Sequence, residues 1–308
     1  MEKKALFVGD INTDIMMGGL ASLPVPDREI TCTSFDIVPG SSAFIAASAF
    51  GSLGGAPAFA GLAGNDENGE FMLAAMKAAG ISPDLVEKTQ TVKTGVTVNL
   101  IQGSVRSQIT YPGAIAEYSG ELLTSEAIRA YAHIHFAGPY QQLKFKDKIT
   151  SLLEKAKESG ITTSIDTQWD ASEKWQHLNA WMKSVDYLFV NSDEAVSITG
   201  CSGAEEACEK LALMTACPVV KLGKAGAISI NSGRVIKAPP YSIQVKDTTG
   251  AGDNFDAGFL YAVLMKGMPF NEALHFANAA GARSCLYTGG TAAKSTFRNI
   301  IDFMEANK

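Results

Sequence analysis

A short segment near the C-terminal end of the chain carries residue types suited to phosphoryl transfer. Its residues, Asp247–Asp253, read Asp-Thr-Thr-Gly-Ala-Gly-Asp and lead into Asn254–Phe259. The glycines at positions 250 and 252 let the backbone approach an anion closely, because no Cβ is in the way. A helix that begins here would point unpaired N–H groups and the positive end of its dipole at that anion. The segment therefore predicts a phosphate cradle at a helix start.

Asp253, the last residue of this segment, has two interpretations. It could simply cap the helix, since Asp is a preferred N-cap residue. Beside a phosphate cradle its carboxylate could also accept the proton of an attacking hydroxyl. An isolated Gly-Ala-Gly-Asp leaves both interpretations open, and only the resemblance of the longer motif to a known family favours the second. Asp253 would then be the general base, and the backbone N–H groups of Gly250, Ala251, Gly252 and Asp253 would stabilise negative charge on the transferred group.

The rest of the chain supplies the elements that would position this segment. Ala5–Gly9 is a short apolar run that predicts a buried parallel strand. From about residue 131 the chain alternates between apolar strands and helices, with strands expected at 133–138, 161–166, 187–190 and 218–222. This alternation predicts an α/β fold, with a mostly parallel central sheet, helices on both faces, and ligands at the carboxyl ends of the strands.

Two β-rich patches interrupt the alternation, at residues 28–38 and 94–111, the second with Gly103 in a connecting turn. We interpret them as a small β-sheet lid, inserted through segments of about 12–38 and 92–113 into a single domain that spans residues 1–308. A lid would exclude water, which competes with a hydroxyl acceptor for the phosphoryl group. Exposed lid strands also favour edge pairing, so we expect a homodimer formed through them.

Composition excludes several classes of protein. The net charge of −6 and the pI near 5.3 argue against nucleic acid as a partner. No run of about 18 apolar residues occurs, so no membrane partner is expected. The N-terminal residues lack a signal-peptide core, and the five cysteines form no Cys-x-x-Cys pair, which favours a cytoplasmic protein. His133 and His135 share one strand face, but a zinc site would need a further ligand, so packed histidines are expected.

The signature segment resembles the nucleotide-binding motif of the ribokinase-like (PfkB) carbohydrate kinases, Asp-Thr-x-Gly-Ala-Gly-Asp. The resemblance extends over essentially the whole chain, and Gly61, Gly64, Asp66 and Gly69 match a second family motif, Gly-x-x-Gly-x-Asp-x-x-Gly. It implies a ribokinase-like fold and a phosphotransferase with an alcohol group as acceptor. The implied reaction is transfer of the γ-phosphoryl group of ATP to a primary hydroxyl of a small sugar.

The resemblance also implies a nucleotide site with Mg²⁺. Asn191 and Glu194 match the family's Asn-x-x-Glu motif, which orders the hydration shell of Mg²⁺ and contacts phosphate, although a capped helix start is the alternative explanation of the pair. Gly223 and Gly226 match a turn whose backbone adjoins the nucleotide, and Asn278 falls near the adenine ring. The cradle glycines would complete the ATP site. Lys224 could reach phosphate or be an exposed turn residue.

Acceptor residues are implied at the end of the first strand and at the start of the following helix. Asn12 and Asp14 fall where the family holds sugar hydroxyls, although two polar residues past a strand could also form a turn. Gly40 and Ser41 match the start of a Gly-Gly-x-x-x-Asn motif. Here Ser41 replaces the second glycine and Ile45 the asparagine. The apolar pair Phe44 and Ile45 either shapes the pocket for a less polar group or serves helix packing.

Many relatives bind a monovalent cation beside the signature segment. An ungapped comparison implies K⁺ as the ion and, as its ligands, Asp247 and the carbonyl groups of Thr249, Cys285, Thr288 and Gly290.

Several other protein classes compete with a sugar kinase. A nucleoside kinase of the same fold would suit an apolar pocket wall, whereas a sugar phosphate would need a cationic cluster, and only Arg28 and Arg106 lie in the expected lid. A Rossmann dehydrogenase is disfavoured because Gly9–Asn12 lacks the Gly-x-Gly-x-x-Gly fingerprint, and the P-loop pattern is also absent. A non-catalytic sensor that binds ATP or sugar is the alternative from a different class.

Overall fold

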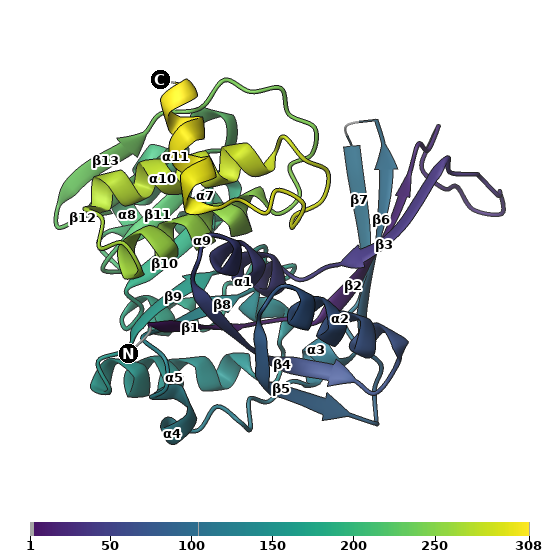
Figure 1. The fold of residues 1–308 in the computed structure, drawn as a ribbon, viewed down its shortest axis with the longest axis horizontal. Coiled ribbons are helices and arrows are strands. Elements are labelled where there is room, and N and C mark those ends of the chain that lie inside the picture. Colours follow the sequence, from purple (N-terminus) through teal and green to yellow (C-terminus); the bar gives the residue numbers. More distant parts are fainter. Residues whose placement is uncertain (1–2, 104, 308) are drawn as a thin grey trace.

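A nine-stranded sheet forms the centre of the computed structural model, which describes residues 3–103 and 105–307 (Figure 1). The strand order is β13-β12-β11-β10-β9-β8-β1-β4-β5. Seven strands, from β11 to β5 in that order, pair in parallel, and β12 and β13 are antiparallel. Their bounds are β1 Lys4–Val8, β4 Ala56–Gly64, β5 Ser82–Thr89, β8 His133–Ala137, β9 Thr162–Asp166, β10 Tyr187–Asn191, β11 Pro218–Lys221, β12 Ala227–Asn231 and β13 Arg234–Ala238.

Helices cover both faces of this sheet, and its strands therefore bury side chains in both directions. In β1, Ala5 and Phe7 join one hydrophobic cluster while Leu6 and Val8 join the other, as the two-residue period of a strand requires. One face is covered by α1 Ser42–Ser52, α2 Glu67–Ala78, α9 Ala251–Leu264, α10 Phe270–Ser284 and α11 Phe297–Ala306. The other is covered by α3 Ala114–Glu117, α4 Ser125–Ile128, α5 Lys146–Glu158, α6 Leu178–Met182, α7 Ser192–Thr199 and α8 Ala204–Leu211.

Short single-turn helices complete the secondary structure, namely η1 Pro139–Gln141 and η2 Gly223–Ala225. Within the residues that the structure describes, no helix is both long and apolar enough to cross a membrane.

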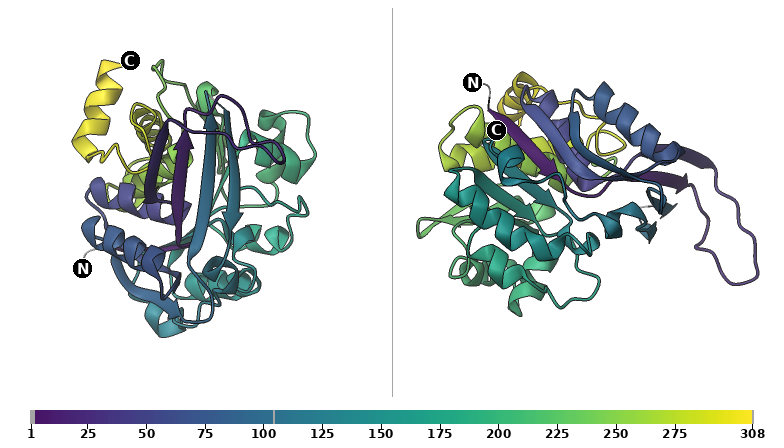
Figure 2. Two further views of the ribbon diagram at one scale, coloured as in Figure 1. Left: turned by 90° about the vertical axis from the view of Figure 1, so that its right-hand side faces the viewer. Right: turned by 90° about the horizontal axis from the view of Figure 1, so that it is seen from below.

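A second, four-stranded sheet projects from one side of the main sheet (Figure 1). This small sheet has the order β3-β2-β6-β7, with bounds β2 Asn12–Gly18, β3 Ser34–Pro39, β6 Gly95–Gln102 and β7 Val105–Tyr111. Its two outer pairs are antiparallel, and β2 and β6 pair in parallel. The loop between β2 and β3 extends far beyond the strands (Figure 2).

Two local expectations for this region are wrong. Residues 12–18 form a strand rather than a turn, because Asn12 to Met17 pair along β6 in continuous register. The strand expected at 28–38 begins only at Ser34, because residues 28–33 have no partner strand in the ladder, although their composition is rich in β-branched residues.

The signature segment leads into helix α9, which includes its last three residues and is buried along most of its length. Gly250 adopts a left-handed conformation, with φ of 70°, and turns the chain into the helix. Glycine also permits close packing against α10: a Cβ on Gly258 would lie 2.8 Å from the Cβ of Ala280, and one on Gly281 would lie 2.9 Å from the carbonyl oxygen of Ala251. This packing holds the N-terminus of α9 at the carboxyl ends of the parallel strands.

The aromatic cluster around Phe259 should contribute most to holding α9 against the sheet. Phe259 is fully buried, and its ring lies 5.1 Å from Tyr187, 5.5 Å from Phe189 and 5.2 Å from Phe270. We expect Phe259→Ala to lower the free energy of unfolding by about 3–5 kcal/mol, because it removes a large buried ring and leaves a cavity. Guanidinium chloride unfolding would measure the loss.

Leu213→Ala is the matched control for this truncation. Leu213 is 88% exposed, so its removal should change the free energy of unfolding by less than about 0.5 kcal/mol. Equal effects of the two substitutions would contradict the assigned core.

Candidate active site

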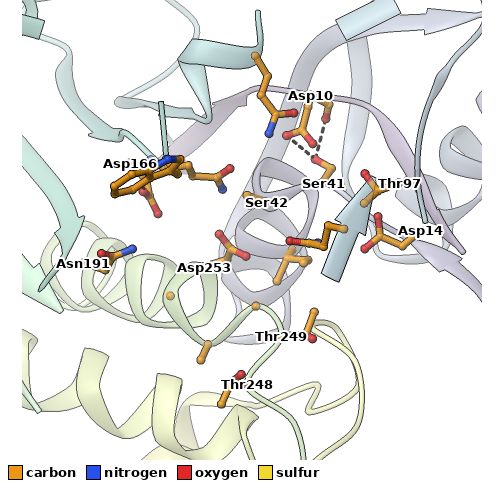
Figure 3. A pocket seen from close by; sticks show the side chains of 18 of the residues that line it. Asp10, Asp14, Ser41, Ser42, Thr97, Asp166, Asn191, Thr248, Thr249 and Asp253 are labelled. Atoms are coloured by element: carbon orange, nitrogen blue, oxygen red, sulfur yellow. Dashed lines mark hydrogen bonds between the residues drawn. The ribbon is translucent and has the colours of Figure 1, made fainter. Parts of the chain in front are cut away.

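A cavity of about 590 Å³ lies between the carboxyl ends of the parallel strands, the N-terminus of α9 and the inner face of the small sheet. Figure 3 shows Asp166, Asn191 and Asp253 on one side of it, and Ser41, Thr97 and Asp14 on the other. Most of the charged and polar lining residues fall into three groups. The ends of the main-sheet strands and α7 supply Asp10, Asp166, Asn191, Glu194 and Lys221, the small sheet supplies Asn12, Asp14, Thr97, Arg106, Gln108 and Thr110, and the signature segment supplies Thr248–Asp253. Ser41, Ser42, Gln141 and Gln168 complete the polar lining.

Most residues singled out from the sequence meet at this cavity. Those that line it are Asn12, Asp14, Ser41, Asn191, Glu194, Gly223, Gly250, Ala251, Gly252 and Asp253. Gly226 and Asn278 lie outside it, and the Asn278 amide donates to the carbonyl oxygen of Pro239 at 2.6 Å. Lys224 is exposed and also lies outside the cavity lining, and Arg28 is exposed. The predicted acceptor and phosphate residues thus share one space.

Asp253 lies in the first turn of α9 and is buried. Burial raises the pKa of Asp253 to about 8, the negative charges of Asp166 and Asp10 act in the same direction, and Lys221 opposes them. In the ligand-free protein the carboxyl group is therefore largely protonated at neutral pH, and a nearby cation would favour its ionised form. Of the neighbouring backbone groups, the Ala251 N–H already donates to the carbonyl oxygen of Thr248 at 3.2 Å.

Asn191 and Glu194 form a capping box at the start of α7, so the local alternative raised for this pair is correct. The Asn191 side-chain oxygen accepts from the Glu194 N–H at 2.9 Å, and the Glu194 carboxylate accepts from the Asn191 N–H at 2.8 Å. Both side chains also line the cavity. Burial and the neighbouring Asp166 raise the pKa of Glu194 to about 7. The cap therefore fixes a carboxylate at the cavity wall, where it could order the water shell of Mg²⁺.

A cluster of buried charged side chains at the cavity wall was not identified from the sequence. The Lys221 ammonium lies 2.9 Å from the Asp166 carboxylate and 3.2 Å from that of Asp256, which is fully buried. Although burial acts the other way, the Lys221 ammonium and hydrogen bonds hold the pKa of Asp166 below its usual value. The available signal was positional, because Asp166 and Lys221 are the last residues of β9 and β11. Parallel strands bring such ends together.

The side of the cavity where acceptor residues are predicted is a hydrogen-bonded polar ladder on the small sheet. The Asn12 amide donates to Asp14 at 2.8 Å and to Thr97 at 3.2 Å, and the hydroxyl groups of Thr97 and Thr110 are 3.0 Å apart. The side-chain oxygen of Asn12 is buried without a hydrogen-bond partner. A polar atom buried in this way is costly unless a ligand satisfies it, which suits a site for hydroxyl donors.

Ser41 and Asp10 form a second polar contact that the motif comparison did not include. Ser41 has a φ of 76°, a region that favours glycine, yet its hydroxyl donates to the Asp10 carbonyl oxygen at 2.6 Å and lies 3.3 Å from the Asp10 carboxylate. The same hydroxyl accepts from the Phe44 N–H and caps α1. Burial raises the pKa of Asp10 to about 7. The serine is thus retained by the bonds that its hydroxyl makes.

Ile45 packs against the signature loop rather than reaching across the cavity. A Cβ on Gly250 would lie 2.9 Å from one of its methyl groups, and a Cβ on Gly290 would lie 2.6 Å from another. Ile45 also contributes to the cavity lining, whereas Phe44 is buried in the core. Packing therefore accounts for both residues, and Ile45 adds an apolar patch to the wall.

The segments expected to hold K⁺ lie together, with several of the expected oxygens already hydrogen-bonded. The Asp247 carboxylate accepts from the N–H and hydroxyl of Thr249 and from the Gly289 N–H, all within 2.9 Å. The Cys285 carbonyl accepts from the Lys246 N–H, and the Gly290 carbonyl accepts from the Asn254 amide. Across residues 3–103 and 105–307, no group of three or more His, Cys, Asp or Glu side chains is placed to hold a metal ion.

His133 and His135 are buried within the sheet. His133 is hydrogen-bonded to Thr162 and Ser164, and His135 shares Ser164, each at 2.8 Å. Burial lowers the pKa of both imidazoles, to about 4 for His135. These contacts give them a structural role.

Gly40 provides a test of the acceptor wall. A Cβ at Gly40 would collide with the side chains of both Asp14 and Asn12. We expect Gly40→Ala to raise the KM for the acceptor at least ~10-fold, because loss of one or two hydrogen bonds to a substrate costs about 1–3 kcal/mol. The KM for ATP should change little. Steady-state kinetics with each substrate varied in turn would measure both.

Gly203→Ala is the control for this substitution, because a Cβ at Gly203 meets open space. A Gly40→Ala enzyme with an unchanged acceptor KM would place acceptor binding elsewhere.

The chain matches known kinases over nearly its whole length. The model of the pfkB family of carbohydrate kinases matches residues 3–296. An ATP-dependent ribose-1-phosphate kinase of Halopiger xanaduensis is 26% identical over 283 residues, which cover 91% of this chain and 90% of the relative. A ribokinase of Haemophilus influenzae is 24% identical over an alignment covering 99% of both chains.

A solved structure has the same fold. The ribokinase of Arabidopsis thaliana, in complex with ribose and ATP, superposes with a TM-score of 0.85 at 23% identity, covering 99% of both chains. The α/β fold predicted from the sequence, with a mostly parallel sheet, helices on both faces and a small additional sheet, is confirmed. The resemblance noted from the signature segment is confirmed as well.

Proposed function

Because the chain belongs to the pfkB family of carbohydrate kinases, we propose that it transfers the γ-phosphoryl group of ATP to a primary hydroxyl of a small neutral sugar. The observation that carries the proposal is the position of Asp253 at the N-terminus of α9. There the carboxyl group faces a cavity shared by the polar ladder of the small sheet and by the Asn191/Glu194 pair.

In the proposed reaction the acceptor oxygen forms a bond to the γ-phosphorus as the bond from that phosphorus to the bridging oxygen of ADP breaks. The acceptor proton passes to the ionised carboxylate of Asp253, and ADP leaves with the electron pair of the broken bond. The backbone N–H groups of residues 250–253 would stabilise the charge on the phosphoryl oxygens, because those in the first turn of a helix have no intrahelical partner. The small sheet would cover the acceptor and exclude water.

Asn191 and Glu194 are the residues that would hold Mg²⁺ through its water shell, and the ion would neutralise phosphate charge. Gly223, Gly226, Gly250, Gly252 and Asn278 are the proposed nucleotide contacts. A monovalent cation is proposed beside Asp247 and the carbonyl groups of Thr249, Cys285, Thr288 and Gly290. A carbonyl oxygen has two lone pairs, so one that accepts a hydrogen bond can also bind K⁺.

The charge of the acceptor side favours a neutral sugar. Asp10 and Asp14 lie there with uncharged Asn12 and Thr97, and among the described lining residues Arg106 is the single cation on this side. The Arg106 guanidinium donates to the Thr249 hydroxyl at 2.8 Å. A second phosphate would require several cationic side chains.

A nucleoside is the second candidate, on one specific observation. Trp169 lines the cavity and is 44% exposed, so together with Ile45 it would offer an apolar face to a base.

The experiment that tests the reaction is release of ADP from MgATP across neutral sugars, sugar acids, sugar phosphates and nucleosides, with and without K⁺. Turnover on a neutral sugar is the expected result. Turnover on nucleosides alone would replace the acceptor class, and ATP binding without turnover on any acceptor would favour a sensor. A rate that is independent of K⁺ would remove the monovalent cation from the proposal.

Asp253→Asn should abolish most activity and stabilise the protein. We expect kcat to fall at least ~10²-fold with ATP binding preserved, because general-base removal costs about that much. The pKa of Asp253 is about 8 when folded and about 3.9 in an unfolded chain. The protonated group therefore stabilises the fold, and that stabilisation is lost as the pH rises through about 8.

The stability effect follows from the same carboxyl group. Asparagine carries no charge, so the melting temperature of the variant should exceed that of the wild type by more than about 2 °C at pH 9, and by less at pH 5. Calorimetry at both values of pH would measure the difference. A variant with normal turnover would exclude Asp253 as the base.

The homodimer is proposed through the outer face of the small sheet. Phe35 and Ile37 on β3 and Val105, Ile109 and Tyr111 on β7 are at least half exposed. Along the register, Ile37, Ile15, Val98 and Ile109 stand side by side across all four strands. An exposed apolar sheet face of this kind marks an interaction surface.

We expect Ile37→Lys/Ile109→Lys to be monomeric, because two buried charges would oppose pairing of the faces. Light scattering coupled to gel filtration would give the mass. The control is Val245→Lys, an exposed residue outside the small sheet. A monomeric wild-type protein would contradict the proposed dimer.

A further inference from the structure

Lys221 is a buried cation directly beneath the signature loop. It is the last residue of β11, and its side chain retains only 13% of its exposure. A Cβ built on Gly252 would lie 3.2 Å from the Lys221 ammonium nitrogen. The second glycine of the loop therefore passes over the ammonium group with no side chain between them.

The ammonium group has three N–H donors and two carboxylate partners. Asp166 accepts at 2.9 Å, and Asp256 accepts at 3.2 Å and 3.3 Å through its two oxygens. One donor can serve each carboxylate, and Lys221 also belongs to the cavity lining. The third donor is thus available to a ligand in the cavity.

The charges of the cavity lining indicate what this third N–H donor would bind. The lining contains five carboxyl groups, those of Asp10, Asp14, Asp166, Glu194 and Asp253. Against these, the described lining residues include two cations, Arg106 and Lys221, and Arg106 lies on the acceptor side. A polyphosphate brings further negative charge, so the nucleotide side needs a fixed positive group in addition to Mg²⁺.

Lys221 remains charged in this position. Burial alone would lower its pKa, but Asp166, Asp256 and Glu194 outweigh that effect and raise the pKa above the ordinary lysine value. A buried ion pair is not in itself a strong source of stability, because apolar residues of similar size often serve as well. A charged lysine at a cavity wall therefore calls for a functional explanation.

We propose that Lys221 is a catalytic residue whose ammonium group contacts the equatorial oxygens of the γ-phosphoryl group during transfer. This inference rests on the proposed kinase function. Lys221 forms no covalent bond: the phosphorus passes from the bridging oxygen of ADP to the acceptor oxygen while the ammonium group stabilises the charge between them. Asp166 and Asp256 are positioning residues, which hold the ammonium group beneath Gly252.

The test compares Lys221→Met and Lys221→Arg with Lys88→Met, an exposed lysine that pairs with Glu70. With the acceptor found for the wild type, Lys221→Met should lower kcat at least ~10²-fold and change the KM for ATP less than ~10-fold, because the contact forms in the transition state. Lys221→Arg should recover part of kcat, and Lys88→Met should match the wild type.

A second measurement does not depend on turnover. Calorimetric titration would compare MgADP alone with MgADP plus aluminium fluoride and acceptor, a mimic of the transferring group. Lys221→Met should weaken binding of the mimic at least ~10²-fold and that of MgADP less than ~3-fold, since transition-state mimics bind much more tightly than substrates.

A variant that preserves folding guards against a structural explanation. Lys221→Met leaves Asp166 and Asp256 buried without their shared partner, so Lys221→Met/Asp166→Asn removes the ammonium group together with the closer of the two carboxylates. If this folded double variant keeps kcat within ~3-fold of the wild type, Lys221 is only an ion-pair partner and the inference fails while the kinase function stands. A wild-type protein without turnover on any acceptor would overturn the kinase function, and the inference with it.

Discussion

The close packing of α9 against α10 and α1 is the constraint on which the site depends. Gly258 and Gly281 allow the two long helices to touch, and Ile45 of α1 supports the turn at Gly250. The start of α9 is therefore half-buried at the wall of the cavity. In such an environment the unpaired N–H groups of the first helical turn act on an anion far more strongly than they would at an exposed helix end.

The same burial concentrates unfavourable charge. Asp10, Glu194 and Asp253 each have a raised pKa, with burial as the first cause. These carboxyl groups cost folding free energy when they ionise, so the site reduces the stability of the fold once they are charged. A cation bound as proposed would offset this cost, and that gain would form part of the binding free energy of a metal–nucleotide complex.

Local motifs could be recognised in the sequence, and pairing between distant residues could not. The signature segment and the Asn191/Glu194 pair were identifiable because each carries its meaning within a few residues. The strand rhythm likewise predicted the α/β fold. Lys221 was missed because its partners, Asp166 and Asp256, are 55 and 35 residues away and meet it only in the folded sheet.

Departures from a motif were also hard to interpret without coordinates. Ser41 stands where the motif has a glycine, but its hydroxyl group donates a hydrogen bond to Asp10, thirty-one residues away. This bond stabilises a backbone conformation with positive φ that favours glycine. Residues 12–18 form a strand that was not predicted, because Asn12 and Asp14 are polar residues typical of a turn. Its pairing with β6 defines this strand. In both cases the deciding contact is non-local.

The hydrogen bond from Arg106 to Thr249 joins the small sheet to the signature segment. An exposed bond of this kind contributes about 1 kcal/mol. By itself it would favour the arrangement of the small sheet seen here over a more open one by only about fivefold. An acceptor bound to β2 and β6, as proposed, would add its own hydrogen bonds to those that hold the small sheet in place. A sugar that binds weakly there would leave the nucleotide exposed to water, and hydrolysis of ATP would then compete with transfer to the sugar.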